Sequence, residues 1–250
     1  MDQKIILITG ASSGIGAALA RAHARTGIAL LLWGRDEARL NETAAQCRAL
    51  GAETIVQSLD IRDTGAFVAQ LKAADAATPI DLAVFNAGMG GTIPKDAFAE
   101  APEITQAVAT VNFTAPLMGA TVMADAMARR GRGQIVLMGS MSESYPLPMA
   151  PTYAATKAGL RMFAEALGIR MARYRVTVTL ISPGFVDTPM SRSLTEPKPF
   201  LIGADEAAVI MARKIASGAT TIVVPWQFRV MRAVTDFLPR ALVRWVLSRA

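Results

Sequence analysis

Residues 4–16 read KIILITGASSGIG, and this stretch decides the fold that the sequence predicts. Residues 4–9 are an apolar run without polar alternation, as in a strand that is buried on both faces. The glycines that follow permit a tight turn and a close approach of the backbone to a ligand. Residues 17–26 then carry a helical pattern, and residues 28–33 (IALLLW) form a second apolar run. A strand, a glycine-rich turn, a helix and a strand within about 30 residues predict a dinucleotide-binding unit, with the pyrophosphate at the helix N-terminus.

Strand-like and helix-like segments alternate along the rest of the chain. Strands are expected near residues 4–9, 28–33, 53–58, 81–86, 133–139, 175–182 and 220–224. Helices are expected near residues 15–26, 36–50, 63–74, 100–129, 152–173 and 204–217. This alternation predicts an α/β fold, with one doubly wound Rossmann domain over residues 1–225, a mostly parallel seven-stranded sheet and helices on both faces. Ligands bind at the carboxyl ends of such strands, so Gly10, Asn86, Ser140 and Pro183 are expected along one edge.

The composition suits a cytoplasmic globular enzyme and excludes several kinds of site. Hydrophobic residues make up 52% of the chain and charged residues 18%, which argues against disorder. Cys47 is the one cysteine and His23 the one histidine, so a disulfide framework, a thiolate zinc site and a Ser-His-Asp triad all lack required parts. No metal site is expected, and no stretch approaches the ~18 apolar residues that cross a bilayer. Acid-base chemistry must then come from Tyr, Lys or carboxylate side chains.

Tyr153 and Lys157 stand four residues apart in a predicted helix, and Ser140 lies thirteen residues before Tyr153 at the end of a strand. Positions i and i+4 project from the same face of a helix, so the phenol and the ammonium are expected side by side. The unperturbed pKa of a phenol is ~10, and the adjacent positive charge is expected to lower the pKa of Tyr153. The hydroxyl of Ser140 is then placed to bind the same substrate oxygen.

Taken together, the motifs resemble those of the short-chain dehydrogenase/reductase family, in its compact single-domain branch. The matching features follow the family's order and span residues 9–188. They are TGASSGIG at residues 9–16, Asp60-Ile61, Asn86-Ala87-Gly88, Asn112, Ser140, Tyr153 with Lys157, and Pro183-Gly184 followed by Thr188.

The resemblance implies a set of catalytic and cofactor-binding residues. The implied catalytic residues are Ser140, Tyr153, Lys157 and Asn112. The implied cofactor-binding residues are Gly10, Ser12, Ser13, Gly14, Ile15, Gly16, Arg35, Asp60, Ile61, Asn86, Ala87, Gly88, Tyr153, Lys157, Pro183, Gly184, Val186 and Thr188. In these roles Lys157 holds the nicotinamide ribose, and Asn112 bends its helix and holds a water beside Lys157. Asp60 accepts from the adenine amino group, while Ile61 packs on the adenine ring.

Some of these residues also have structural explanations. Asp60, like the nearby Asp63, suits a helix N-cap, and the side chain of Asn86 suits a tie between neighbouring strands. Ser142 competes with Ser140 for the role of the serine. The interval to the tyrosine favours Ser140 and leaves Ser142 to line the pocket or to bond to the local backbone.

The end of the second predicted strand bears on the choice of cofactor. NAD-dependent enzymes usually place an acid here, which accepts from the ribose 2′-hydroxyl and repels a 2′-phosphate. Gly34 stands at that position, and Arg35 follows where NADP users often carry a base. NADP(H) is therefore the expected cofactor, with NAD(H) as the alternative because Asp36 comes one residue later. Arg35 also suits an ordinary surface charge paired with Asp36 or Glu37.

The implied reaction interconverts a carbonyl and an alcohol by hydride transfer, with Tyr153 as acid and base and Ser140 stabilising the oxyanion. Residues 189–203 are expected to form a flap over a hydrophobic small-molecule substrate. Further side chains expected in the pocket are Met141, Tyr145, Leu147, Met149 and Met190. The alternatives are a catalytically silent NADP(H)-binding sensor or scaffold protein, and a lyase or isomerase on the same scaffold.

Residues 226–250 form a basic extension beyond the family pattern. They hold five Arg and one Asp, a net charge of +4, whereas the other residues carry a net charge of +2. Residues 239–249 suit an amphipathic helix that covers the pocket, contacts a second subunit or lies on an anionic membrane surface. Nucleic-acid binding is not expected, since no recognition motif accompanies the charge. The resemblance implies a homodimer or homotetramer built through helices 100–129 and 152–173.

Overall fold

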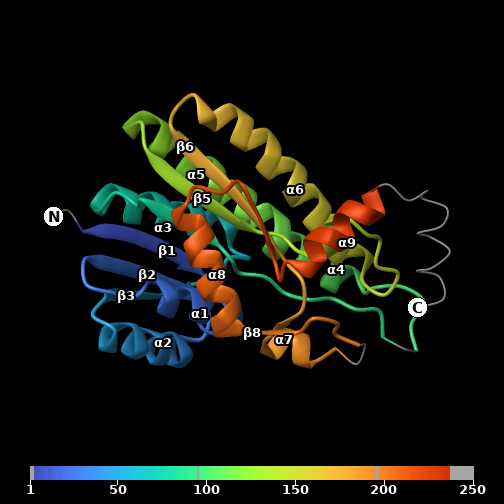
Figure 1. Ribbon diagram of the computed structural model, residues 1–250. Coiled ribbons are helices and arrows are strands. Elements are labelled where there is room, and N and C mark those ends of the chain that lie inside the picture. Colours follow the sequence, from blue (N-terminus) through green and yellow to red (C-terminus); the bar gives the residue numbers. More distant parts are fainter. Residues whose placement is uncertain (1–2, 95, 195–196, 237–250) are drawn as a thin grey trace.

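The computed structural model describes residues 3–94, 96–194 and 197–236 of the chain (Figure 1). The strands in these ranges are β1 (Lys4–Thr9), β2 (Ile28–Gly34), β3 (Glu53–Ser58), β4 (Leu82–Phe85), β5 (Gly133–Met138), β6 (Val176–Pro183), β7 (Val186–Asp187), β8 (Ile202–Gly203) and β9 (Thr221–Val224). The α-helices are α1 (Gly14–His23), α2 (Glu37–Ala49), α3 (Thr64–Ala77), α4 (Pro102–Ala109), α5 (Ala115–Arg130), α6 (Pro151–Ala172), α7 (Pro189–Arg192), α8 (Ala204–Ala216) and α9 (Gln227–Asp236). The described residues also contain a π-helical turn, η1 (Thr110–Thr114), and a 3₁₀ turn, η2 (Met141–Glu143).

The main sheet has seven strands in the order β3-β2-β1-β4-β5-β6-β9, and every neighbouring pair is parallel. From β1 the chain builds outward to β3 on one side, and from β4 it builds outward to β9 on the other. The strand order therefore reverses between β1 and β4, where ligands of doubly wound sheets bind outside the carboxyl ends of the strands. The predicted Rossmann architecture is confirmed.

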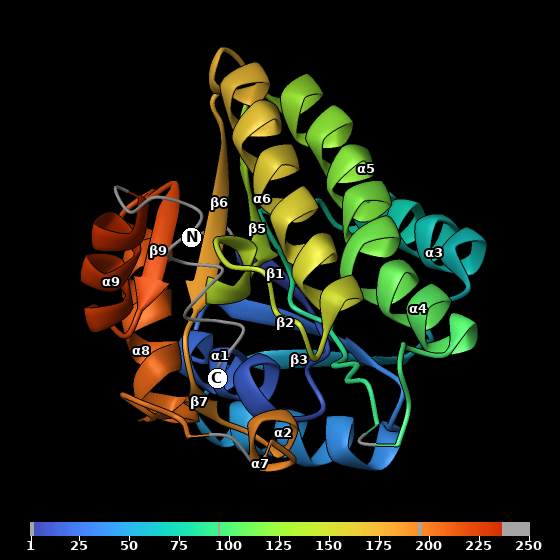
Figure 2. The same cartoon turned by 90° about the vertical axis from the view of Figure 1, so that its right-hand side faces the viewer.

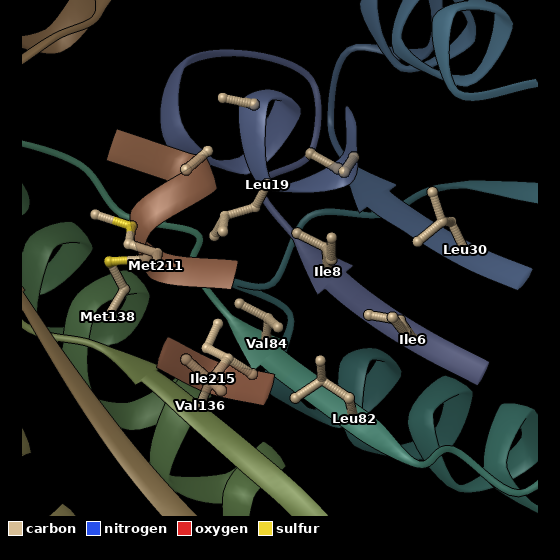
Figure 3. Close-up of a cluster of buried hydrophobic side chains, with 14 of the residues drawn as sticks. Ile6, Ile8, Leu19, Leu30, Leu82, Val84, Val136, Met138, Met211 and Ile215 are labelled. Carbon is tan, nitrogen blue, oxygen red and sulfur yellow. The ribbon is translucent and has the colours of Figure 1, made fainter. Parts of the chain in front are cut away.

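Successive side chains of the strands enter two separate hydrophobic cores. Ile8 of β1 belongs to the core beneath α1, α2 and α8, whereas Leu7 belongs to the core beneath α3, α5 and α6. Figure 2 shows these helices as layers on opposite faces of the sheet. Figure 3 shows part of the first core, in which Leu19 of α1 and Met211 of α8 lie over the strands. Burial of each large aliphatic side chain in these cores contributes roughly 1.5–3 kcal/mol to the free energy of folding.

The predicted helix 100–129 is present as the helical run Pro102–Arg130, in which the π turn η1 lies between α4 and α5. By length and mean hydropathy (1.4), the run Pro102–Arg130 would suffice to cross a membrane, which corrects the expectation that no such stretch exists. Half of its most apolar window is buried inside the fold, where Met123 and Met127 of α5 belong to the second core. Its hydropathy is thus explained by packing against the sheet.

The segment between β6 and α8 contains short elements that the sequence pattern did not predict. β7 pairs in parallel with β8, and α7 lies between them along the chain. This pairing fastens both ends of the predicted flap, residues 189–203, next to the carboxyl edge of the main sheet. Ile202 is buried in the first core, whereas Phe200 and Leu201 remain about half exposed.

The helix α9 begins directly after β9 and belongs to the basic extension. Its Phe228 is buried and contacts Met141 of η2 and Val223 of β9. Figure 1 shows α9 beside the end of the sheet from which the loops after β5 and β6 emerge. The helix predicted for residues 239–249 lies outside the described residues.

Candidate active site

The three side chains expected to carry the chemistry meet at the carboxyl edge of β5. Ser140 follows β5 and caps the turn η2, while Tyr153 and Lys157 lie in the first two turns of α6. The Nζ atom of Lys157 lies 5.6 Å from the centre of the Tyr153 ring and donates a hydrogen bond of 2.8 Å to the Met138 carbonyl. Lys157 is buried and Tyr153 is partly exposed. The side-by-side arrangement predicted from their spacing is therefore present.

The pKa of Tyr153 is raised above its ordinary value, and the expectation of a lowered pKa is wrong for the protein alone. Burial disfavours the phenolate and is the largest cause, and the carboxylate of Glu143 adds to it. A hydrogen bond with Ser140 acts in the opposite direction without reversing the shift. The ammonium of Lys157 faces the ring and is bonded to a backbone carbonyl, so it does not offset the burial.

Burial also lowers the pKa of Lys157, to about 8. The carboxylate of Glu143 opposes this shift, since a nearby negative charge favours the ammonium. Lys157 is therefore a cation at neutral pH that loses its charge in mildly alkaline solution.

The glycine-rich turn between β1 and α1 leaves its backbone open to a ligand. Gly10 and Gly14 have positive φ angles of 68° and 54°, and a Cβ on Gly16 would lie 2.1 Å from the Gly10 carbonyl oxygen. Ser13 is the N-cap of α1, but its side chain makes no capping hydrogen bond. Together with the partly exposed Ser12 and Ile15, this turn presents polar groups and free backbone N–H groups at a helix N-terminus, as pyrophosphate binding requires.

Asn86 ties β4 to β1, as its structural explanation predicted. Its Nδ2 donates to the Thr9 carbonyl at 3.0 Å and to the Gly10 carbonyl at 3.3 Å. The backbone N–H groups of Asn86 and Ala87 both donate to the hydroxyl of Thr9, at 3.0 and 3.1 Å. The bonding role of the Thr9 hydroxyl was not predicted, since it appears only when β1 and β4 pair.

Asn112 lies in the π turn and is fully buried. Its side chain accepts from the Met89 N–H at 2.9 Å and donates to the Met89 carbonyl at 2.8 Å. A Cβ on the neighbouring Gly88 would lie 3.4 Å from Asn112 Oδ1 and 3.9 Å from Lys157 Nζ. Asn112 and Lys157 thus face the same point of the chain after β4, and a water between them stays a prediction.

The end of β2 carries the residues that bear on the choice between NADP(H) and NAD(H). Asp36 caps α2 and pairs with Arg39 (3.3 Å), so it is engaged within its own helix. Arg35 is exposed, and among the described residues no ion pair or side-chain hydrogen bond of its guanidinium is seen. A Cβ on Gly34 would lie 3.5 Å from the Ser12 hydroxyl, which places the glycine turn beside Arg35.

Asp60 and Ile61, which follow β3, make contacts within the protein that the resemblance did not imply. Asp60 binds Arg62 through both its backbone N–H (2.9 Å) and its guanidinium (2.8 Å to Nε), and this bonding lowers the pKa of Asp60. The N-cap of α3 is Asp63. Ile61 is buried in the second core, so its contact with an adenine ring stays a prediction.

The turn after β6 closes over the glycine-rich turn. Pro183 ends β6, and Val186 is buried where β7 pairs with β8. Thr188 lies against Gly14, since a Cβ on that glycine would be 3.2 Å from its methyl group. The Thr188 hydroxyl accepts from the Ser191 N–H at 3.2 Å and so caps α7.

The predicted pocket side chains differ in exposure. Met141 is buried, and its neighbours include Tyr145, whereas Met149 and Met190 are more than a third exposed and Leu147 is partly exposed. Ser142 donates its backbone N–H to the Ser140 hydroxyl at 3.2 Å. Glu143, which the sequence reading missed, is buried behind Ser140, and the pattern Ser-x-x-Glu of a capping box was its available signal. Within residues 3–236, with the gaps given above, no His, Cys, Asp and Glu side chains cluster as metal ligands.

Fold and site together define a Rossmann protein built for a dinucleotide. The family model "short chain dehydrogenase" matches residues 4–199. An uncharacterized oxidoreductase of Myxococcus xanthus is 32% identical over 97% of this chain and 95% of its own length. A putative ketoacyl reductase of Streptomyces coelicolor is 34% identical over 78% of this chain and 75% of its own. The crystal structure of a point variant of actinorhodin polyketide ketoreductase with NADPH superposes with a TM-score of 0.80 at 27% identity, covering 90% of this chain and 97% of that one.

The chain belongs to the short-chain dehydrogenase family and is an oxidoreductase of that family.

Proposed function

We propose that the protein is an NADP(H)-dependent oxidoreductase that interconverts a carbonyl and an alcohol on a hydrophobic substrate. The observation that carries the proposal is the meeting of Ser140, Tyr153 and Lys157 at the carboxyl edge of β5, the strand next to β4, at which the strand order reverses. The residues present suit a dinucleotide, because the N-terminus of α1 follows the glycine-rich turn and has no side-chain cap, which leaves its backbone N–H groups for a pyrophosphate. When bound, the nicotinamide supplies or accepts the hydride.

Each catalytic side chain has a distinct task in this proposal. Tyr153, whose raised pKa keeps it protonated near neutral pH, donates a proton to the carbonyl oxygen in the reducing direction. Ser140 donates a hydrogen bond to the same oxygen and stabilises its developing charge. Lys157, a cation at neutral pH with its pKa at about 8, holds the ribose hydroxyls and favours the phenolate once the proton has left.

The preference for NADP(H) rests on the turn after β2. Gly34 provides no acid to repel a 2′-phosphate, Asp36 is engaged with Arg39, and the exposed Arg35 stands beside Ser12. An arginine binds phosphate oxygens through parallel hydrogen bonds, which suits this position. The relative whose structure contains NADPH agrees with the proposal.

The proposed substrate class is a hydrophobic ketone, with a ketoacyl compound as the first choice. Two relatives are named as ketoacyl or polyketide ketoreductases. The side chains near the site, Met141, Tyr145, Met190 and Phe200, are apolar or aromatic and offer few charges to a polar substrate. Methionine side chains adapt to irregular apolar ligands, which fits this class.

The central test is Tyr153→Phe, which removes the proton donor and leaves the ring. We expect NADPH binding within about threefold of the wild type and a loss of turnover of at least 10²-fold, the usual contribution of a general acid. NADPH oxidation with a panel of aromatic and β-ketoacyl thioester ketones provides the assay, and fluorescence titration measures binding. Undiminished turnover contradicts the role of Tyr153, whereas cofactor binding with no turnover on any substrate favours a silent sensor.

We also propose a homo-oligomer that forms through α5 and α6. Met118 of α5 and Met162 and Ile169 of α6 are exposed, the last by 81%, and apolar patches of this kind suit subunit contacts. Light scattering of Ile169→Glu against the wild type tests the proposal, and an unchanged mass contradicts it. The cytoplasmic location and a membrane contact of the basic extension stay predictions, which cell fractionation and cosedimentation with anionic liposomes address.

A further inference from the structure

A buried carboxylate lies directly behind the catalytic serine. The side chain of Glu143 has no exposed surface, and its Oε2 accepts a hydrogen bond of 3.4 Å from the Ser140 N–H. The Ser140 hydroxyl accepts in return from the Ser142 N–H, which completes a capping box around η2. Gly139 makes the room, since a Cβ there would lie 2.6 Å from Glu143 Oε2. The carboxylate therefore holds the backbone from which Ser140 projects.

The second oxygen of Glu143 connects this turn to two further elements. Oε1 accepts from the Ser182 hydroxyl of β6 at 2.7 Å and from Nη1 of Arg232 at 3.0 Å. Arg232 belongs to α9 and its side chain is 15% exposed, so the ion pair is largely shielded from water. A shielded ion pair is sensitive to loss of either partner, because the remaining charge then loses an opposite charge that stabilises it inside the protein.

The same helix also contacts the opposite side of the site. Phe228 of α9 packs on the turn after β6, where a Cβ on Gly184 would lie 2.2 Å from its ring. The ring lies edge-on to Phe185 at 6.1 Å and to Phe200 at 5.8 Å between centres. Through Phe228 and Arg232, α9 touches both the turn that follows β6 and the turn that carries Ser140.

We propose that Glu143 and Arg232 are positioning residues for the reaction, through which α9 of the basic extension orients Ser140 and sets the electrostatic field at Tyr153. The inference rests on the proposed function, because it assigns Ser140 and Tyr153 their catalytic roles. Neither Glu143 nor Arg232 exchanges a proton with the substrate.

The charges around Glu143 and Arg232 determine in which direction each of them shifts the ionisation of Tyr153. Arg232 from α9 and Arg161 from α6 favour the ionised form of Glu143, against the burial that raises its pKa. Glu143 in turn raises the pKa of Tyr153 and of Lys157, both from α6. Removing the carboxylate leaves the cation of Arg232 behind, so phenolate forms more readily. Removing the arginine leaves the carboxylate, so phenolate forms less readily.

The test follows the ionisation of Tyr153 in Glu143→Gln, Arg232→Gln and the double variant. Tyrosine labelled with ¹³C at Cζ reports phenolate directly, and the chain has three tyrosines, so Tyr153→Phe assigns the signal. We expect Tyr153 to titrate at lower pH in Glu143→Gln and at higher pH in Arg232→Gln, with a separation on the order of one pH unit and the double variant between them. The alkaline limb of alcohol oxidation is expected to move in the same two directions.

Arg229→Gln is the matched control, because it removes the same charge from the exposed side of the same helix. It is expected to leave the titration and kcat unchanged. The inference is overturned if the Tyr153 titration moves in the same direction in both single variants, or does not move in a variant that folds. If only one of the two variants folds, the direction of its shift alone tests the inference. The NMR titration needs no substrate, so a failure of the proposed reaction is distinguished from a failure of this inference.

Discussion

At the scale of single residues, burial decides the charges of the site more than neighbouring charges do. The spacing of Tyr153 and Lys157 predicted their arrangement but not the direction in which the pKa of Tyr153 moves. A spacing of four residues is a local property, whereas the desolvation of the phenol and the approach of Glu143 come from tertiary packing. The capping-box pattern Ser-x-x-Glu could have indicated Glu143, but its ion pair with Arg232, 89 residues away, could not be predicted locally.

A first prediction concerns the pH dependence of cofactor binding. The ammonium of Lys157 has its pKa lowered to about 8, so its charge is present below pH 8 and is lost as the pH rises through that value. We expect the Kd for NADPH to rise roughly tenfold between pH 7 and 9.5, the value of one hydrogen bond from a charged group. Fluorescence titration of the wild type, Lys157→Met and the surface control Lys72→Met measures it.

Lys157→Met is expected to bind weakly with little dependence on pH, and Lys72→Met to follow the wild type. A pH-independent Kd in the wild type would show that the Lys157 charge does not contribute to binding.

At the scale of elements, the regular strands and helices were predictable and the irregular turns were not. The βαβ unit at residues 4–33 is encoded locally by apolar periodicity and by glycines. The resemblance implied a bend at Asn112, which lies in the π turn η1, but the hydrogen bonds of Asn112 with Met89 cross the fold and no local pattern reveals them. The β7–β8 pair is likewise formed between two-residue segments that have no period to detect.

A second prediction concerns the turn between β2 and α2. Gly34 does not have a positive φ, and a Cβ there would make contacts of 3.4 Å or more, so a larger residue fits. Gly34→Asp is expected to lower the ratio of kcat/KM for NADPH over NADH at least tenfold, because the new carboxylate repels the 2′-phosphate and accepts from a ribose hydroxyl. Steady-state kinetics with both cofactors checks this, and an unchanged ratio means that the 2′-phosphate lies elsewhere.

At the scale of the whole molecule, the two cores and the parallel sheet follow from the alternation of apolar segments along the chain. The seven-stranded parallel sheet with helices on both faces was predicted, whereas the strand order and the face that each helix covers are seen only in the structure. The packing of α9 on the site was not, because the extension has an amphipathic sequence that suits several partners. Its described part, residues 226–236, contacts the rest of the protein through Phe228 and Arg232.

A third prediction concerns acid stability. The chain's one histidine, His23, is 7% exposed, and burial lowers its pKa to about 4, with smaller contributions from Lys4 and Arg25. The unfolded chain binds a proton below its ordinary pKa of 6.5 and the folded chain does not. The contribution of His23 to the free energy of unfolding is therefore fully present above pH 6.5 and is lost as the pH is lowered to 4. The free energy of unfolding is expected to fall by about 2–3 kcal/mol between pH 7.5 and 4.5.

Urea unfolding of the wild type and His23→Phe at these two pH values measures the effect. The variant is expected to lose about 2–3 kcal/mol less than the wild type over this interval. An equal loss in both proteins would assign the acid sensitivity to carboxylates instead.

The position of β1 has a consequence for how the protein is made. β1 leaves the ribosome before the other described strands, yet it lies inside the sheet and pairs with β2 on one side and β4 on the other. Until β4 has been translated, one edge of this apolar strand lacks its partner, and such edges template aggregation. The outer edge of β6 likewise lacks its partner until β9, near the end of the described chain, has been translated. Nascent chains stalled before residue 82 are thus the ones expected to need a holding chaperone.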